Sequence, residues 1–189
     1  MIMKRSSPGV YFAVRSPVCV GGDEIVRLKR IGLNARIGRS RLCTHPNIKN
    51  RLHEMLIVHT KGAYVQPHRH QNKPESYHVI EGVADLLFFD IRGCLTGVLP
   101  LGDNASGRIF YCRLNDSRFH TLVIRSETFV FHEVTTGPFR RENTVFAPWA
   151  PGPKAKNEQR IFMKMLEAEI NRFYASTGNK LLKRKPKKT

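Results

Sequence analysis

The sequence predicts an all-β fold: an antiparallel jelly-roll barrel that is preceded by a helical segment and followed by a second helix and a basic tail. Three observations support this prediction. Short apolar runs separated by turn residues fill residues 54–134, histidines and a carboxylate crowd between two glycines in residues 62–82, and residues 157–175 repeat apolar side chains at helical spacing. A chain of 189 residues with one such series of runs is expected to build one core.

The chain divides into five consecutive segments. The first contains Ser6-Ser7-Pro8-Gly9 and has no periodicity, the second has a helical pattern over residues 23–33 with Asp23 as its expected cap, and the last is rich in lysine. The predicted segments are a flexible lead-in (1–22), a helix and basic loop (23–53), the barrel (54–151), a C-terminal helix (152–175) and a basic disordered tail (176–189).

Eight short apolar runs are predicted to be the barrel strands, because each is bounded by residues that favour turns. Eight is the strand number of a jelly roll built from two Greek keys. The runs are 55–59, 64–70, 77–80, 84–91, 97–101, 108–114, 120–124 and 128–134. The only tryptophan, Trp149, follows them and is interpreted as a plug at one end of the barrel.

The segment from Gly62 to Gly82 has the composition of half a metal site. His68 and His70 project to the same side of an extended strand, because successive side chains alternate between faces. Pro74 interrupts that strand and Glu75 opens the next one, so a hairpin would return the carboxylate toward the two imidazoles.

The spacing G-x5-H-x-H-x4-E-x6-G resembles the first motif of the cupins. The fixed positions are filled by Gly62, His68, His70, Glu75 and Gly82. More narrowly, the amino-acid sequences of residues 54–57, 67–70 and 146–151 are similar to the WbuC family of cupin-fold metalloproteins. This resemblance covers residues 24–151. The resemblance implies the cupin double-stranded β-helix.

A second cupin motif normally contributes one more histidine, and His120 takes that position. Asn115 and Ser117 replace the proline and glycine of the preceding turn, and both also favour turns. Ile124 stands where the motif has an asparagine, so this copy is divergent. The resemblance implies one divalent transition metal (Fe, Mn, Zn, Ni or Co) held by His68, His70, Glu75 and His120.

Basic residues precede the barrel in a stretch that is similar to the corresponding part of the WbuC family. Arginines clamp phosphates and carboxylates bidentately, so this stretch would hold an anionic substrate if it folds over the barrel mouth. The alternative, an exposed loop, is equally compatible with the sequence. The candidate substrate-binding residues are Arg36, Arg39, Arg41 and His45.

Two classes of function remain open. The first is a metal-dependent enzyme acting on a small anionic oxygenated substrate, such as a sugar or nucleotide-sugar. The family resemblance implies surface polysaccharide biosynthesis and an isomerase or epimerase, in which Glu75 or Tyr77, which share a strand face, would move a proton. An Fe(II) dioxygenase is the variant within this class. The second class is a non-catalytic, metal-centred protein that binds a small ligand.

The composition limits which binding partners and which cellular location are expected. A net charge of +17 without a recognition motif predicts only non-specific binding of nucleic acid, through the basic tail. The absence of a long apolar run and of a convincing signal peptide predicts a cytoplasmic protein without a membrane span. The four cysteines form no C-x-x-C pair, so reduced thiols are expected, with metal contact by Cys112 as a minor alternative. Cupins commonly pair, so a homodimer is a further expectation.

Overall fold

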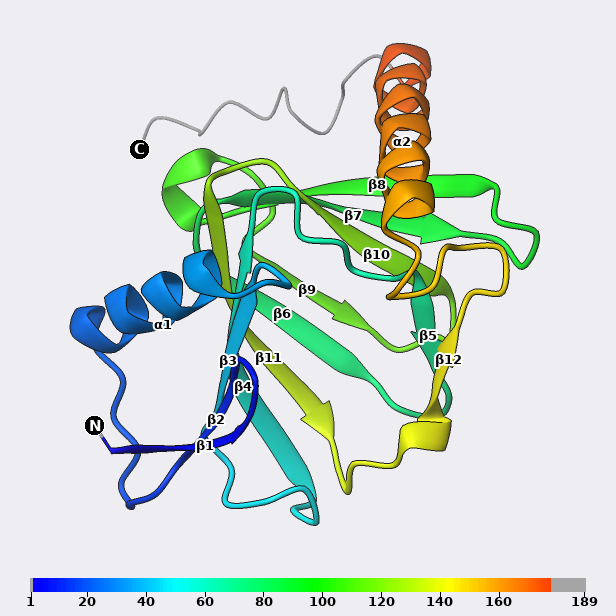
Figure 1. The fold of residues 1–189 in the computed structure, drawn as a ribbon. Coiled ribbons are helices and arrows are strands. Elements are labelled where there is room, and N and C mark those ends of the chain that lie inside the picture. The colour runs from blue at the N-terminus through cyan, green and yellow to red at the C-terminus, as the bar shows by residue number, and fades with distance from the viewer. Residues whose placement is uncertain (1, 178–189) are drawn as a thin grey trace, which may run out of the picture.

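The computed structural model describes residues 2–177, in which two facing β-sheets lie between two helices (Figure 1). The elements along the chain are β1 (Met3–Ser7), β2 (Val10–Ala13), α1 (Gly22–Asn34), β3 (Arg39–Cys43), β4 (Leu52–Thr60), β5 (His68–His70), β6 (Glu75–Glu81), β7 (Val83–Phe89), β8 (Leu95–Gly102), the 3-10 turn η1 (Asn104–Ser106), β9 (Tyr111–Leu114), β10 (Phe119–Ile124), β11 (Thr128–Thr136), η2 (Arg141–Asn143), β12 (Thr144–Phe146) and α2 (Lys156–Ser176).

The strands form a sandwich of two sheets, which confirms the prediction of an all-β fold. One sheet has the order β1-β2-β3-β4-β11-β6-β9 and the other has the order β12-β5-β10-β7-β8. All pairings are antiparallel except β2 with β3. Each sheet keeps two edge strands, so the sandwich is not a strictly closed barrel.

Every one of the eight predicted runs overlaps a strand, but four other strands were not predicted: β1, β2, β3 and β12. Residues 1–22 are therefore not a loose lead-in within the described part, because β1 and β2 pair with each other and β2 joins the sheet. Val10 and Phe12 pack on the core between the sheets, while Tyr11 and Ala13 pack on the opposite side. A strand that is covered on both faces lacks the alternation by which strands are recognised.

Helix α1 covers the outer face of the seven-stranded sheet and extends one residue beyond the predicted helix at each end. Leu28 is fully buried there against Leu42 and Val58. The cap is Gly21 rather than Asp23, and the Gly21 N–H donates to the Glu24 carboxylate at 2.9 Å.

Helix α2 covers the outer face of the five-stranded sheet and also extends one residue beyond its predicted limits. Leu166 and Ile170 are buried on this face, whereas Ile161 and Met165 of the expected apolar stripe are each 59% exposed. Trp149 packs in the same layer, so it is not a plug at the end of a barrel. The rings around it belong to Phe89, Phe119 and Phe162.

An ion-pair network also attaches α2 to the sheet. The Arg125 guanidinium donates to the buried Asp85 carboxylate at 2.6 Å and to both Glu167 carboxylate oxygens of α2 at 2.6 Å. The Tyr174 hydroxyl donates to the other Asp85 oxygen at 2.7 Å, and an Arg108 nitrogen lies 3.7 Å from that oxygen.

The inner faces of the two sheets make the main core, which is dominated by aliphatic side chains and by Phe129 and Phe131. At one end this space is polar instead, and the functional residues lie there. Of the tail that was expected to be disordered, residues 178–189 lie outside the described residues, and Ser176 ends α2. Within residues 2–177 there is no helix with the length and apolar character needed to cross a bilayer.

Candidate metal centre and cavity

Three histidines converge between the sheets. His68 and His70 lie on β5, and His120 lies opposite His68 on the paired strand β10. One ring nitrogen from each of the three imidazoles lies within 4.8 Å of the others. The structure therefore brings together the predicted histidines, and period-two alternation accounts for the shared direction of the first two.

Glu75 reaches this cluster from the opposite sheet. The chain turns at Asn72, whose φ of +51° is left-handed, and crosses from β5 to β6. The expected hairpin is therefore absent, because the two strands belong to different sheets. The Glu75 carboxylate lies 2.9 Å from His120 Nε2 and 3.4 Å from His70 Nε2. The carboxylate thus flanks the three-histidine group.

Backbone carbonyls fix the orientation of two of these rings. His68 Nδ1 lies 2.8 Å from the Gln66 carbonyl and His120 Nδ1 lies 3.1 Å from the Arg118 carbonyl. A carbonyl only accepts, so each Nδ1 carries a proton, and in a neutral ring the Nε2 lone pair is then free. This orientation by outer partners is usual for histidines that bind metals.

The free nitrogen of His120 shows that the donor set suits a cation. His120 Nε2 is buried and makes no hydrogen bond of acceptable geometry, although Glu75 Oε1 is 2.9 Å away. A lone pair facing a carboxylate oxygen is unfavourable unless a proton or a metal ion lies between them. Either occupant would satisfy both atoms.

The charge states of His68 and Glu75 also suit a divalent ion. Burial and the neighbouring His120 lower the pKa of His68 to about 3, so the ring is neutral. Burial of Glu75 alone would raise the pKa of its carboxyl, but the imidazoles of His120 and His70 reverse this and leave the pKa below its ordinary value. Metal binding requires neutral imidazoles and an ionised carboxylate. Burial alone would lower the pKa of His120, but the Glu75 carboxylate outweighs burial and raises the pKa, so a metal would displace a proton there.

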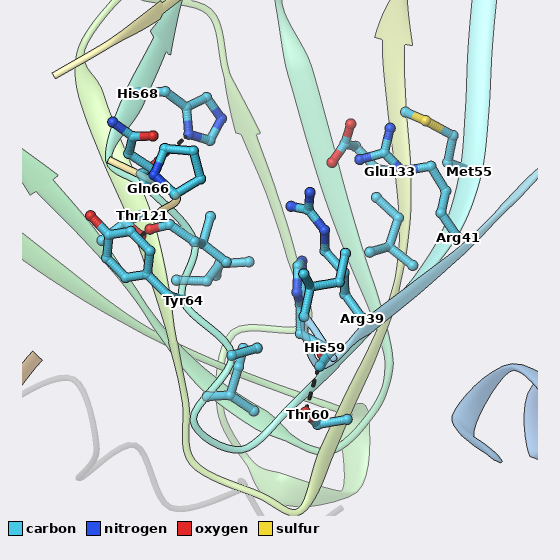
Figure 2. A pocket seen from close by; sticks show the side chains of 18 of the residues that line it. Arg39, Arg41, Met55, His59, Thr60, Tyr64, Gln66, His68, Thr121 and Glu133 are labelled. Carbon is cyan, nitrogen blue, oxygen red and sulfur yellow. Dashed lines mark hydrogen bonds between the residues drawn. The ribbon is translucent and has the colours of Figure 1, made fainter. Parts of the chain in front are cut away.

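A cavity of about 1620 Å³ extends from the histidines between the sheets and is also lined by residues of α2. Figure 2 shows His68, Gln66 and Tyr64 on one wall, with Arg39, Arg41 and Glu133 across from them. Tyr77 also lines the cavity, as its shared strand face with Glu75 predicts, and is 4% exposed. Burial and the Glu75 charge raise the pKa of Tyr77 well above its ordinary value, so the phenol keeps its proton.

The candidate anion-binding residues are not all equivalent. Arg39 and Arg41 do not lie on a loop, because they belong to β3 and alternate with Ser40 and Leu42, which face α1. Both arginines line the cavity. The reason the expectation of a loop was wrong is that β3 is covered on one face by α1, and its polar residues lie on the cavity face.

The other two candidates occupy different positions. Arg36 is exposed and lines the rim of the cavity just beyond α1. His45 is 6% exposed and stacks on His53 with 4.1 Å between ring centroids. The His45 Nδ1 also contacts the backbone of Glu54, at 3.0 Å from the carbonyl oxygen and 3.2 Å from the amide nitrogen. These contacts hold the His45 ring at the edge of the cavity.

Two cavity residues were missed by the sequence argument. Glu133 on β11 pairs in register with Tyr77, and burial together with the Glu75 charge raises the pKa of its carboxyl. His59 on β4, which the sequence does not mark as a candidate, lines the cavity and is 6% exposed. Both share a strand face with core residues, Phe131 and Ile57, and this parity was the available signal.

Cys112, the minor alternative for metal contact, and two further histidines are not part of the three-histidine cluster. Cys112 faces Tyr77 across the β6–β9 pair, and burial raises the pKa of its thiol to about 12, with the Glu75 charge acting in the same direction. His78 is exposed, and His132, on the face opposite to Phe131, is 30% exposed near Glu54.

Comparison with known proteins gives distant matches. Residues 29–101 match the model of a family described as a domain of unknown function (DUF6016), and no curated protein matches. One similar solved structure is SO0799 from Shewanella oneidensis, with 15% identity and a TM-score of 0.43; the match covers 54% of this chain and 65% of that one. Another is oxalate decarboxylase from Bacillus subtilis, with 21% identity and a TM-score of 0.42; the match covers 52% of this chain and 24% of that one. A third is procruciferin, an 11S globulin from Brassica napus, with 17% identity and a TM-score of 0.39; the match covers 50% of this chain and 21% of that one.

In all three cases less than two thirds of the matched chain is covered. Identities and TM-scores this low carry no information about ligand or reaction.

Proposed function

We propose that this protein is a metal-dependent cupin of the WbuC type that acts on a small anionic, oxygen-rich substrate, such as a sugar or nucleotide-sugar. The observation that carries the proposal is the convergence of three imidazole nitrogens within 4.8 Å of one another beside a buried carboxylate, at the wall of a large cavity. His68, His70 and His120 would hold a divalent ion of Fe, Mn, Zn, Ni or Co, with Glu75 as the anionic ligand.

The charge of the cavity wall supports an anionic substrate. Ten lysine and arginine side chains line the cavity and its mouth, against three carboxylates. The cations are Arg36, Arg39, Arg41, Lys61, Lys73, Arg125, Arg141, Lys156, Arg160 and Lys164, and the carboxylates are Glu75, Glu133 and Glu167. A cleft lined by one sign of charge concentrates ligands of the other sign.

The reaction class favoured here is isomerisation or epimerisation. A divalent ion at the histidines would polarise a carbonyl or hydroxyl of the substrate. Glu75 presents its two oxygens to two imidazoles, so we assign it to metal binding first and to proton transfer second. Tyr77, whose phenol keeps its proton, and Glu133, whose carboxyl has a raised pKa, face each other in register. These are the neighbouring groups that could exchange a proton with the substrate.

Elemental analysis of protein purified without added metal tests the metal site. Near-stoichiometric metal is expected in the wild type and in His78→Ala, whose imidazole lies on β6 but is exposed. His68→Ala and His120→Ala should lose the metal. Equal metal content in all four proteins, or none in any of them, contradicts the site.

The reaction class needs a separate readout. Incubation of the metal-loaded protein with sugar phosphates and nucleotide-sugars in D₂O should exchange a carbon-bound proton for deuterium, and NMR detects the exchange. Substrate-dependent uptake of oxygen by the iron form would indicate the dioxygenase alternative instead. Binding of these compounds with neither signal would support a non-catalytic, metal-centred binding protein.

A further inference from the structure

A second polar cluster lies along the cavity wall, on β3 and β4. Arg39 of β3 is the direct register partner of His59 of β4, and Arg41 projects from the same strand face two residues further on. Figure 2 shows His59 beside Arg39, with His68 on the other wall. These residues therefore form a group separate from the three histidines.

His59 carries an unsatisfied nitrogen at this place. The side chain is 6% exposed, and its ring stacks on Phe131 with 5.8 Å between centroids and 16° between planes. Its Nδ1 is buried and has no hydrogen-bond partner in the described residues. A buried polar atom without a partner destabilises the fold, and proteins seldom keep one without a use.

No carboxylate of the described residues forms a salt bridge with either arginine, although the charge of Arg41 acts on the neighbouring Glu133 carboxyl (Figure 2). Within residues 2–177 neither guanidinium makes a salt bridge, although both face the cavity. Burial and then the positive charge of Arg41 lower the pKa of Arg39, although the residue is exposed to solvent, and the second cause indicates that the two cations repel each other. An anion between them would remove this repulsion.

The backbone around the cluster is held in place. Gly38 has a φ of +62°, and its carbonyl accepts from the Thr60 amide at 2.9 Å and from the Thr60 hydroxyl at 3.1 Å. A Cβ on Gly38 would collide with the Thr60 hydroxyl oxygen. These bonds tie the start of β3 to the end of β4, so Arg39 and His59 are positioned before any ligand arrives.

We propose that Arg39, Arg41 and His59 form an anion-binding subsite, separate from the histidine cluster, that takes the phosphoryl group of the substrate. Two planar guanidinium groups and one imidazole, from two adjacent strands, supply several hydrogen-bond donors, which suits a tetrahedral oxyanion. This subsite deepens the proposed function, on which it rests for a substrate in this cavity. Binding of an anion here nevertheless requires no metal.

Titration of the full-length protein with inorganic phosphate at constant ionic strength, followed by calorimetry and by NMR of the histidine rings, tests the subsite. Arg39→Gln should weaken phosphate binding by about tenfold or more, because it removes a charged hydrogen-bond donor. The matched control is Arg113→Gln, which removes an exposed arginine of β9 and should leave the affinity unchanged. Equal weakening in both variants would show non-specific attraction and overturn the proposal.

Further variants separate the imidazole and the metal from the arginines. His59→Phe keeps an aromatic ring against Phe131 but no donor and should weaken binding, whereas His59→Gln keeps a donor and should retain most of it. Unchanged affinity in His59→Phe refutes the role of the imidazole. His120→Ala should still bind phosphate without metal, and loss of binding in this variant would place the anion at the histidine cluster instead. Acetate should bind more weakly than phosphate, and the reverse order would exclude a phosphoryl site.

Discussion

Two Arg–Asp pairs of this protein have the same chemistry and opposite environments, so they measure what burial contributes to stability. Asp85 is 2% exposed and accepts hydrogen bonds from Arg125 and Tyr174, which tie α2 to the sheet. Asp116 pairs with Arg118 at the surface, where both side chains are about half exposed (50% and 51%). The substitutions to compare are Asp85→Ala and Asp116→Ala.

The expected effects differ severalfold. Asp85→Ala leaves the Tyr174 hydroxyl and one Arg125 nitrogen without their acceptor, and breaking a buried pair in this way costs about 3–5 kcal/mol. Arg125 is 26% exposed and keeps Glu167 as a partner, so we expect the lower end, about 3 kcal/mol. Asp116→Ala should cost less than about 1 kcal/mol, because solvent screens an exposed pair.

Thermal unfolding followed by circular dichroism measures the difference. A chain of this length loses roughly 2–4 °C in Tm per kcal/mol, so Asp85→Ala should lower Tm by about 6–12 °C. Asp116→Ala should lower Tm by no more than about 4 °C. Urea titration at 25 °C provides an independent free energy of unfolding. Equal losses in the two variants would refute the argument that burial decides the value of the pair.

Three further outcomes are expected. Ile170→Ala should lower the free energy of unfolding by about 2–5 kcal/mol in urea titrations, and Ile161→Ala by about 0.5 kcal/mol or less, because the first side chain is fully buried under α2 and the second is 59% exposed. Burial and the nearby arginines lower the pKa of His59 from 6.5 to about 3. Between about pH 3 and pH 6.5 the unfolded chain therefore binds more protons than the folded protein. The free energy of unfolding falls as the pH drops below 6.5. This group should remove about 2 kcal/mol by pH 5, and His59→Phe should show a loss smaller by that amount in urea titrations at pH 7 and pH 5. A bound divalent metal at a hundred times its Kd should add about 2.7 kcal/mol and raise Tm by about 5–11 °C in the wild type, and a similar rise in His120→Ala would contradict the site.

Local patterns in the sequence were sufficient for some parts of the structure. Eight strands and both helices follow from periodicity, to within a few residues at most boundaries. Side chains alternate between the two faces along one strand, and this predicts that His68 and His70 share a face and that Glu75 and Tyr77 share a face. The strand β2 was missed because residues on both of its faces are covered, so no alternation marks it. The strand β3 was missed because its cavity face carries Arg39 and Arg41 instead of apolar side chains.

Contacts between distant segments were decided only by the tertiary structure. The sequence by itself determined which side chains share a strand face, because that property depends on neighbouring residues alone. It did not determine that Glu75 approaches the imidazoles from the opposite sheet, or that Arg39 lies beside His59 with neither arginine of β3 paired to a carboxylate in the described residues. Strand order and register depend on how the whole chain packs its two sheets, since a shift of one residue would turn every side chain of a strand to the other face.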